Sequence, residues 1–270
     1  CVLCGLALVL PATESFGEDP AEKMARQLQD PLANIKAVLT DNDFLFKSGD
    51  EEETGFSSNI QPLKGFAFED QGFNLMVRGV IPVLGMPGGA QKSILGEPVP
   101  SGEDRVWGLS DIQLQTFFSP RSDSSWKWGV GPMVSLRTRT NSDLAGAGWG
   151  AGPIGVIVGS LSENVGTAIL GGHLWGNEDG FSTTILQPMF FYNIPWAKGW
   201  EIQYNNTITY DWNAESGNRW TIPLGLGVGK TLAFESGWGL NAVLGFYYNA
   251  EKPQGAADGM LRLSLNFILP

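Results

Sequence analysis

Cysteine is almost absent from this chain of 270 residues, since its only two, Cys1 and Cys4, lie within the first four positions. The rest of the chain therefore has no thiols for disulfides or thiolate-bound metals. Histidine is limited to His173, and one ligand is too few for a transition-metal site, which needs three or four. No serine lies in a G-x-S-x-G setting. We therefore expect no enzymatic activity, no metal and no cofactor.

Charge is also scarce. Charged residues make up 17% of the chain, with 17 Lys and Arg against 28 Asp and Glu, for a net charge of −11. Soluble domains carry charge on about a quarter of their residues, and nucleic-acid-binding proteins need basic stripes, so a nucleic-acid partner is excluded. Low charge together with 36 Gly, ten Trp and 15 Phe indicates a protein whose outer face contacts lipid.

Long apolar runs are missing from the body of the chain, which excludes a transmembrane helix. A closed β-barrel is then the one remaining way to satisfy every backbone group inside a bilayer. The leading segment CVLCGLALVLPA resembles the end of a signal peptide with a cleavage site near Ala12, so we assign residues 1–17 to a signal-peptide remnant. Acylation at Cys1 or Cys4 is the alternative, although neither follows a complete lipobox.

A short helix is predicted next, within residues 18–34. Pro20 suits its first position, Ala21, Met24, Ala25 and Leu28 recur at helical spacing, and Pro31 stops it. About ten residues make a helix that is marginal alone and must dock on something. We interpret it as a periplasmic lid or loosely held arm, with a functional plug as the alternative.

From residue 35 to residue 270 the apolar pattern changes to a period of two, which predicts an all-β domain. In strand 199–213, for example, polar side chains from Glu201 to Asp211 alternate with apolar ones from Ile202 to Trp212. An even number of strands, long enough to cross a bilayer at a tilt, is typical of single-chain bacterial barrels. The twelve predicted strands are 35–47, 56–68, 73–86, 106–119, 126–140, 149–161, 165–175, 182–194, 199–213, 219–234, 237–250 and 259–270.

The connections between these strands alternate in length, which favours a barrel over a soluble sandwich with Greek-key crossings. The longer set is 48–55, 87–105, 141–148, 176–181, 214–218 and 251–258, and the shorter set is 69–72, 120–125, 162–164, 195–198 and 235–236. We predict a twelve-stranded antiparallel transmembrane β-barrel in the bacterial outer membrane, preceded by the short N-terminal helix, with both termini periplasmic and the long loops outside.

Tryptophans provide an independent check on this topology, because aromatic rings gather at the two membrane interfaces. One predicted girdle, at the outer strand ends, consists of Trp107, Trp149, Trp175, Trp212 and Trp220. The periplasmic girdle consists of Trp126, Trp128, Trp196, Trp200 and Trp238.

Strand parity directs a mixed set of polar side chains into the lumen. The predicted pore-lining residues are Arg78, Asp111, Gln113, Gln115, Lys127, Arg137, Arg139, His173, Gln187, Glu201, Gln203, Asp211 and Arg262. Such a set can line a channel for small molecules, or it can close a non-conducting structural or surface-interaction barrel through ion pairs. We predict the channel, with a narrow passage whose selectivity depends on Arg78, Asp111, Arg137 and Glu201.

Acidic residues dominate the predicted outer loops, and they can be held to lipopolysaccharide phosphates by divalent ions or simply keep the rim soluble. Asp41-x-Asp43 and the run Asp50 to Glu53 hint at calcium but match no complete ligand loop. The partners we expect are the lipid bilayer with its lipopolysaccharide, the barrel-assembly machinery, and a small solute that the sequence does not name.

Several stretches resemble a known family. They are GLSDIQLQTFFSP (108–120), WKWGVGP (126–132), WGAGP (149–153), LQPMFFYN (186–193), TYDWNAESGNRWTIPLGLGVGK (209–230) and YYNAEKP (247–253). In order and content they resemble the widespread bacterial outer-membrane β-barrels labelled "transporter" or, in error, "neuromedin U". Those are similar to the phenol-degradation (MetA-pathway) barrels of the fatty-acid-channel superfamily. The resemblance implies an outer-membrane location and a role in passing small molecules, with no established substrate and no catalytic residues.

Overall fold

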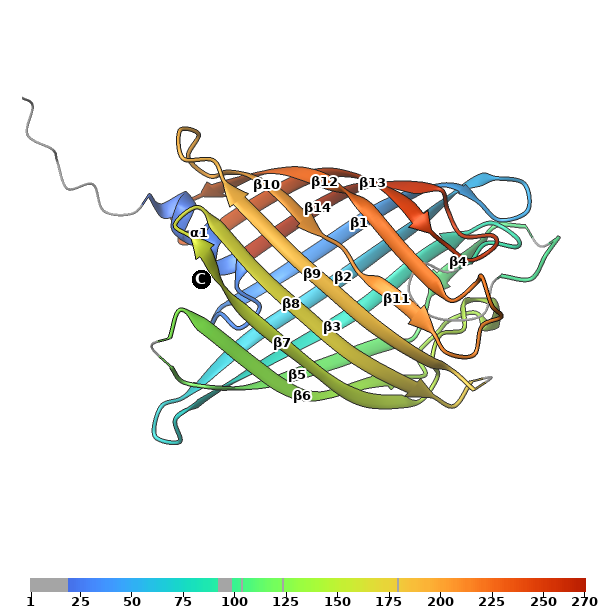
Figure 1. Cartoon of the computed structure of the whole chain (residues 1–270), viewed down its shortest axis with the longest axis horizontal. Coiled ribbons are helices and arrows are strands. Elements are labelled where there is room, and N and C mark those ends of the chain that lie inside the picture. The colour runs from blue at the N-terminus through green and yellow to red at the C-terminus, as the bar shows by residue number, and fades with distance from the viewer. Residues whose placement is uncertain (1–18, 92–98, 103, 123, 179) are drawn as a thin grey trace, which may run out of the picture.

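The computed structural model describes residues 19–91, 99–102, 104–122, 124–178 and 180–270, and the leader assigned above lies outside them. One closed antiparallel sheet dominates this part of the chain (Figure 1). Its strands are β1 (Lys36–Ser48), β2 (Glu53–Phe68), β3 (Phe73–Met86), β4 (Val106–Leu109), β5 (Ile112–Pro120), β6 (Trp126–Leu136), β7 (Gly150–Ser162), β8 (Val165–Gly176), β9 (Ser182–Asn193), β10 (Trp200–Asn205), β11 (Ile208–Asp211), β12 (Trp220–Ala233), β13 (Gly239–Glu251) and β14 (Gly259–Leu269).

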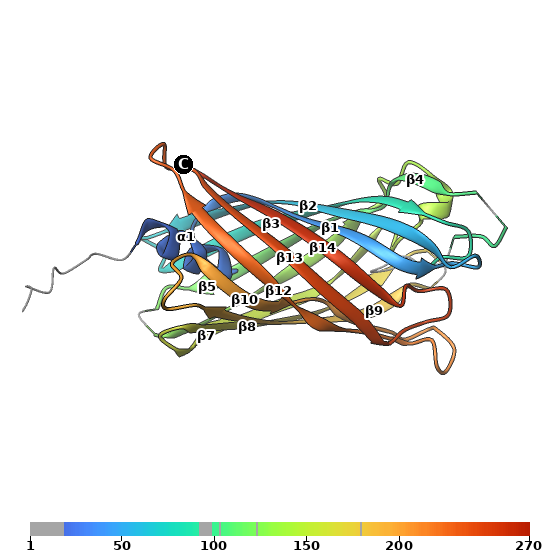
Figure 2. The same ribbon diagram turned by 90° about the horizontal axis from the view of Figure 1, so that it is seen from above.

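The barrel wall has the predicted twelve strand positions, although two of them are interrupted. β4 and β5 both pair with β3, and β10 and β11 both pair with β9, so each of these pairs of strands occupies one position. The first and last strands close the sheet, in a register that runs from Lys36↔Leu269 to Phe46↔Gly259. Figure 2 shows β13, β14, β1 and β2 side by side across this closure.

The outer face of the barrel is apolar. In β12, Leu224, Leu226 and Val228 are 49–60% exposed, whereas Thr231, of the opposite parity, is fully buried. All ten tryptophans are exposed, by 43–80%, as the two predicted girdles require. No helix in the described ranges is long and apolar enough to cross a membrane. An apolar, aromatic-ringed exterior around a polar interior is the architecture of outer-membrane barrels, and the protein is one of them.

One predicted strand, 126–140, is too long. β6 ends at Leu136, and the chain then folds over the barrel end through the short 3₁₀ helix η1 (Ser142–Leu144). The cause is Asp111, whose carboxylate accepts hydrogen bonds from the backbone N–H groups of Arg139, Gly146 and Gly148 at 2.8–3.3 Å. Of these three N–H groups, only that of Arg139 lies within the predicted strand, and all three are satisfied by the carboxylate instead of by a strand ladder.

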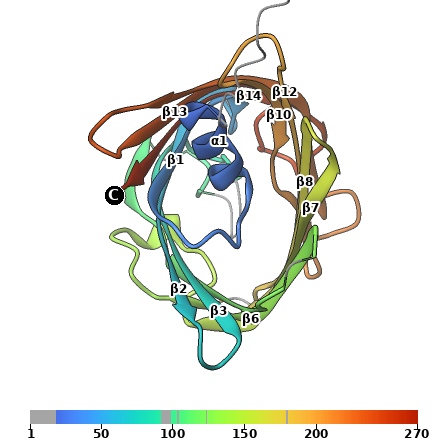
Figure 3. The same ribbon diagram turned by 90° about the vertical axis from the view of Figure 1, so that its left-hand side faces the viewer.

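The predicted N-terminal helix is present as α1 (Pro20–Gln29). Asp19 caps it by accepting a hydrogen bond from the N–H of Ala21, and Pro20 occupies its first turn, where no intrahelical donor is needed. Figure 3 shows α1 inside the ring of strands, at the barrel end that also carries the C-terminus. The helix therefore lies in the mouth of the barrel rather than beside it.

The orientation of the barrel in the membrane gives a testable prediction. Ser101, in the long loop after β3, and Ser124, in the short turn before β6, are both exposed. Cysteine placed at position 101 should react with an impermeant thiol reagent on intact cells, because long loops face outward. Cysteine at position 124 should react only after the outer membrane is permeabilised. Labelling of position 124 alone on intact cells would show that the barrel has the opposite orientation.

Candidate functional site: the lumen

Two cavities follow each other along the inside of the barrel. The outer one has a volume of about 120 Å³, and the one next to α1 about 80 Å³. A polar cavity needs only about 10–15 Å³ to hold a water molecule, so both cavities have room for several. The lumen therefore contains open space between its polar side chains.

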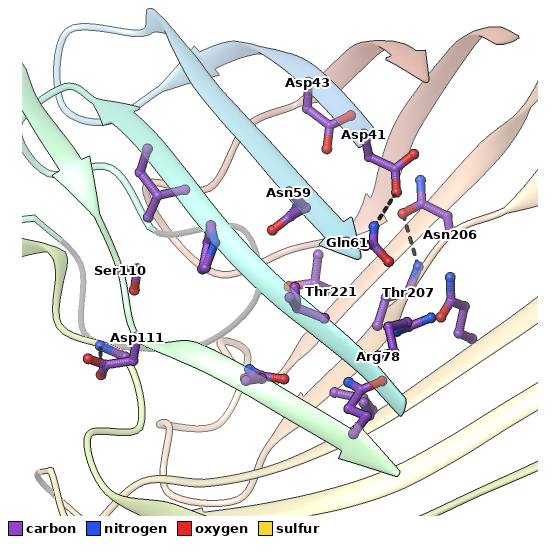
Figure 4. A pocket seen from close by; sticks show the side chains of 18 of the residues that line it. Asp41, Asp43, Asn59, Gln61, Arg78, Ser110, Asp111, Asn206, Thr207 and Thr221 are labelled. Carbon is purple, nitrogen blue, oxygen red and sulfur yellow. Dashed lines mark hydrogen bonds between the residues drawn. The ribbon is translucent and has the colours of Figure 1, made fainter. Parts of the chain in front are cut away.

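Four residues line both cavities: Asp41 on β1, Gln61 on β2, Arg78 on β3 and Gln187 on β9. In the ring of twelve strand positions, β9 lies six places from β2, so Gln187 faces the other three across the lumen. Figure 4 shows Asp41, Gln61 and Arg78 extending from neighbouring strands into the same space. This narrow section, which we call the four-residue waist, separates the two cavities.

Next to the waist, Arg262 and Asp43 form a two-pronged ion pair. Nε of Arg262 donates to Oδ1 of Asp43 at 2.6 Å and Nη2 donates to Oδ2 at 2.8 Å. A third donor of Arg262, Nη1, reaches the carbonyl oxygen of Asn205 at 3.1 Å. Asp43 is 2% exposed, and a charge buried to that degree is tolerated only with such a partner.

Arg78 differs from Arg262 because its guanidinium has no ion pair or hydrogen bond among the described residues. Its Nε is buried without a partner, while the guanidinium borders both cavities. Asp41 is near enough to act on Arg78 electrostatically. However, the Asp41 carboxylate accepts hydrogen bonds from Gln61 Nε2 at 3.1 Å and Ser264 Oγ at 2.6 Å instead.

At the end of the lumen next to α1, polar side chains of the barrel contact the helix. Gln29 Nε2 donates to Asn193 Oδ1 at 2.8 Å and also to Glu201 Oε2, while Asn241 donates to the other Glu201 oxygen at 2.7 Å. Just after the helix, Asp30 pairs with Lys127 at 2.8 Å. The polar side chains at this end therefore hold the helix in place.

The predicted pore-lining residues divide into three groups in the structure. Asp211 caps its own loop at the outer end by accepting from the N–H groups of Asn213 and Ala214, and Lys127 lies at the periplasmic end with Asp30. Arg137, Arg139 and His173 form a second group, which lies outside the two cavities. Those that border the two cavities are Arg78, Asp111, Gln113, Gln115, Gln187, Glu201, Gln203 and Arg262.

The prediction that His173 faces the lumen is wrong. Its ring lies 4.3 Å from that of Trp175 and 6.4 Å from that of Trp212, and both tryptophans are 55% exposed on the outer face. Ser182 and Thr184, on the same face of β9, are its hydrogen-bond partners. His173 thus belongs to the outer aromatic girdle and has no role in the passage.

Arg137 and Arg139 are also displaced from the predicted lumen face, because β6 ends before them. The Arg137 side chain is 54% exposed and its Nε lies 3.4 Å from Glu178 Oε1. Arg139 pairs with the same Glu178 oxygen at 2.6 Å and approaches Asp111 at 3.7 Å. Both arginines therefore hold outer loops together, and the expected dependence of selectivity on Arg137 is withdrawn.

Sequence reasoning missed Asp41, Asp43 and Gln61, which lie near Arg78. The signal was present, because Asp41-x-Asp43 lies within a predicted strand and an i, i+2 spacing places both carboxylates on one face. We interpreted this pair as a hint of calcium. In the structure each carboxylate is bound by side chains instead: Asp43 by Arg262, and Asp41 by Gln61 and Ser264.

Comparisons with known proteins support the fold. No protein-family model matches the sequence, and no curated protein matches it. Among solved structures, the COG4313 outer membrane channel from Pseudomonas putida F1 is similar, with a TM-score of 0.60 and 14% identity over 87% of this chain and 94% of that one. The chain shares the fold of an outer-membrane channel.

Two weaker similarities were also found. The CymD monoaromatic hydrocarbon channel has a TM-score of 0.44 and 8% identity, over 90% of this chain and 91% of that one. A Pseudomonas aeruginosa FadL homologue has a TM-score of 0.40 and 12% identity, over 94% and 93%. Neither carries an argument at that level. None of these three solved structures supports the label "neuromedin U". The absence of enzymatic activity stays a prediction.

Proposed function

We propose that this protein is an outer-membrane channel that passes small solutes through its polar lumen. A shared fold does not by itself transfer a function, so the proposal rests on the lumen. Its central observation is the four-residue waist, where Arg78 borders both cavities without a hydrogen-bond or ion-pair partner among the described residues. A lumen sealed as a structural core would be expected to neutralise this charge, because an unpaired buried charge is costly.

The alternative, a non-conducting structural barrel, also has support in the structure. The Asp43–Arg262 pair bridges part of the lumen, and α1 occupies the periplasmic mouth. Conduction therefore requires α1 to move or solutes to pass beside it. The narrow cavities limit the solutes to small molecules in either case.

Reconstitution of the full chain in planar bilayers separates the two functions. We expect discrete conductance steps in the wild-type protein, because the two cavities adjoin at the four-residue waist and each has room for water. Swelling of liposomes that contain the protein should fall steeply with solute size. If a folded barrel, verified by heat-modifiable gel migration, passes neither ions nor small solutes, the structural alternative holds.

A further inference from the structure

The Nε of Arg78 is buried without a partner, and Arg78 lacks the anion that an arginine in such a position normally pairs with. Its nearest acidic neighbours are already committed, since Asp43 is bound by Arg262 and Asp41 accepts from Gln61 and Ser264. A guanidinium presents planar, paired donors that fit a carboxylate. The side chain therefore offers an unused anion-binding group at the point where the two cavities meet.

A second polar group stands directly beside it. Gln115 on β5 is the register partner of Arg78 on β3, borders the outer cavity, and is 2% exposed. Its Oε1 has no hydrogen-bond partner among the described residues, and its Nε2 reaches only the sulfur of Met133 at 3.6 Å. A flip of this amide would direct the NH₂ group toward an anion bound at Arg78.

One side of the cavity next to α1 is apolar, although Glu201, Gln203 and Asn241 also line that cavity. Leu63 on β2 is the other register partner of Arg78. It packs against a buried cluster that includes Met76, Phe117 and Met189. All four residues line the cavity next to α1. Methionine side chains adapt to ligands of different shape, and an apolar wall with a few convergent polar groups is typical of a small-molecule site.

We propose that this part of the lumen binds small amphipathic monoanions, namely aromatic or short aliphatic carboxylates. The carboxylate pairs with Arg78 and contacts Gln115, and the apolar body lies against Leu63, Met76 and Phe117. This inference rests on the proposed channel function, because it names the class of solute that the passage selects.

The local charges set the sign of the expected effects. Arg262 and Asp43 neutralise each other, which leaves Arg78 to attract an anion and Asp41 to oppose it at longer range. Glu201 lies further along the same cavity, where it repels a second anion. Removing the charge of Arg78 should therefore weaken carboxylate binding, whereas removing that of Asp41 should strengthen it.

Calorimetric titration of the detergent-purified full chain tests the site, with benzoate and hexanoate as probes and benzyl alcohol and hexanol as uncharged counterparts. Arg78→Gln should weaken benzoate binding by about tenfold to a hundredfold, which is the range for a lost hydrogen-bonded charge pair. It should leave the binding of benzyl alcohol unchanged. Asp41→Asn should strengthen benzoate binding severalfold, an opposite change that a folding defect would not produce.

Arg137→Gln, in an exposed outer loop, is the matched control and should bind benzoate as the wild type does. Inorganic phosphate distinguishes a general anion site: if it binds as tightly as benzoate, the amphipathic class is wrong. If the wild type conducts but benzoate does not bind, or Arg78→Gln leaves binding unchanged, the site is refuted while the channel stands. If benzoate binds as described but neither ions nor solutes cross, the site stands and the channel function fails.

Discussion

Replacing Arg262 by glutamine is expected to destabilise the barrel by about 3–5 kcal/mol, the usual cost of removing one partner from a buried ion pair. Asp43 is 2% exposed and would lose both of its bonds to the guanidinium. The backbone oxygen of Asn205 would lose its donor as well. The free energy of unfolding should be measured by urea titration in lipid vesicles, followed by tryptophan fluorescence.

Two further variants test whether the loss of stability in Arg262→Gln comes from breaking the Asp43–Arg262 ion pair. Arg78→Gln removes a lumenal charge that has no partner to leave behind, so its unfolding free energy should stay at or above that of the wild type. The double variant Asp43→Asn with Arg262→Gln should recover much of the stability lost in the single variant. Wild-type stability in Arg262→Gln would show that the carboxylate finds enough water in the lumen, and the ion pair would then have no structural importance.

Releasing α1 from the barrel mouth should increase conductance strongly. Gln29 and Asp30 hold the helix through Glu201 and Lys127, and a hydrogen bond to a charged group contributes about 1.5–3 kcal/mol. A helix of ten residues has little stability of its own. Loss of the buried Gln29–Glu201 bond should therefore raise the population of the undocked helix about tenfold or more. Loss of the exposed Asp30–Lys127 pair should add a smaller increase. Planar bilayers are the assay, with the double variant Gln29→Ala and Asp30→Ala.

Deletion of residues 20–34 should produce the largest increase, because it removes the helix altogether. Lys23→Ala alters an exposed position on the same helix and should conduct like the wild type. A double variant that conducts no better than Lys23→Ala would mean that the helix does not obstruct the passage. The lid interpretation would then have to be abandoned.

Much of the barrel could be predicted from the sequence, because a strand that contacts lipid on one face and water on the other must alternate strictly. Parity placed Arg78 and Arg262, on the uninterrupted strands β3 and β14, on the inner face, and it did the same for Glu201 on β10. The same rule could have corrected His173, which lies two positions before Trp175 and therefore shares its outward face. An inward-facing His173 and an outward-facing Trp175 were therefore inconsistent predictions. In the structure both side chains lie on the outer face.

Other features depend on contacts between distant segments, which a pattern along one strand does not contain. The loop after β6 folds over the barrel end because Asp111, in the break between β4 and β5, binds three of its backbone N–H groups. Gln29 and Glu201 form a hydrogen bond although they are 172 positions apart in the sequence. The docking of α1 could therefore not be predicted from residue spacing. The pairing of the lumenal charges likewise depends on which strands become neighbours when the barrel closes.

The register of β1 with β14 has a consequence for the order of folding. Asp43 and Arg262 are 219 positions apart, and their strands become neighbours only once the last segment has been synthesised. Closing so long a loop costs entropy, and until then β1 is an open edge that invites pairing with other chains. A chain cut short before β14 would keep both that edge and a bare carboxylate. Closure of the barrel therefore removes the open edge of β1 and pairs Asp43 in one event, which makes chains that lack β14 physically distinct from closed barrels.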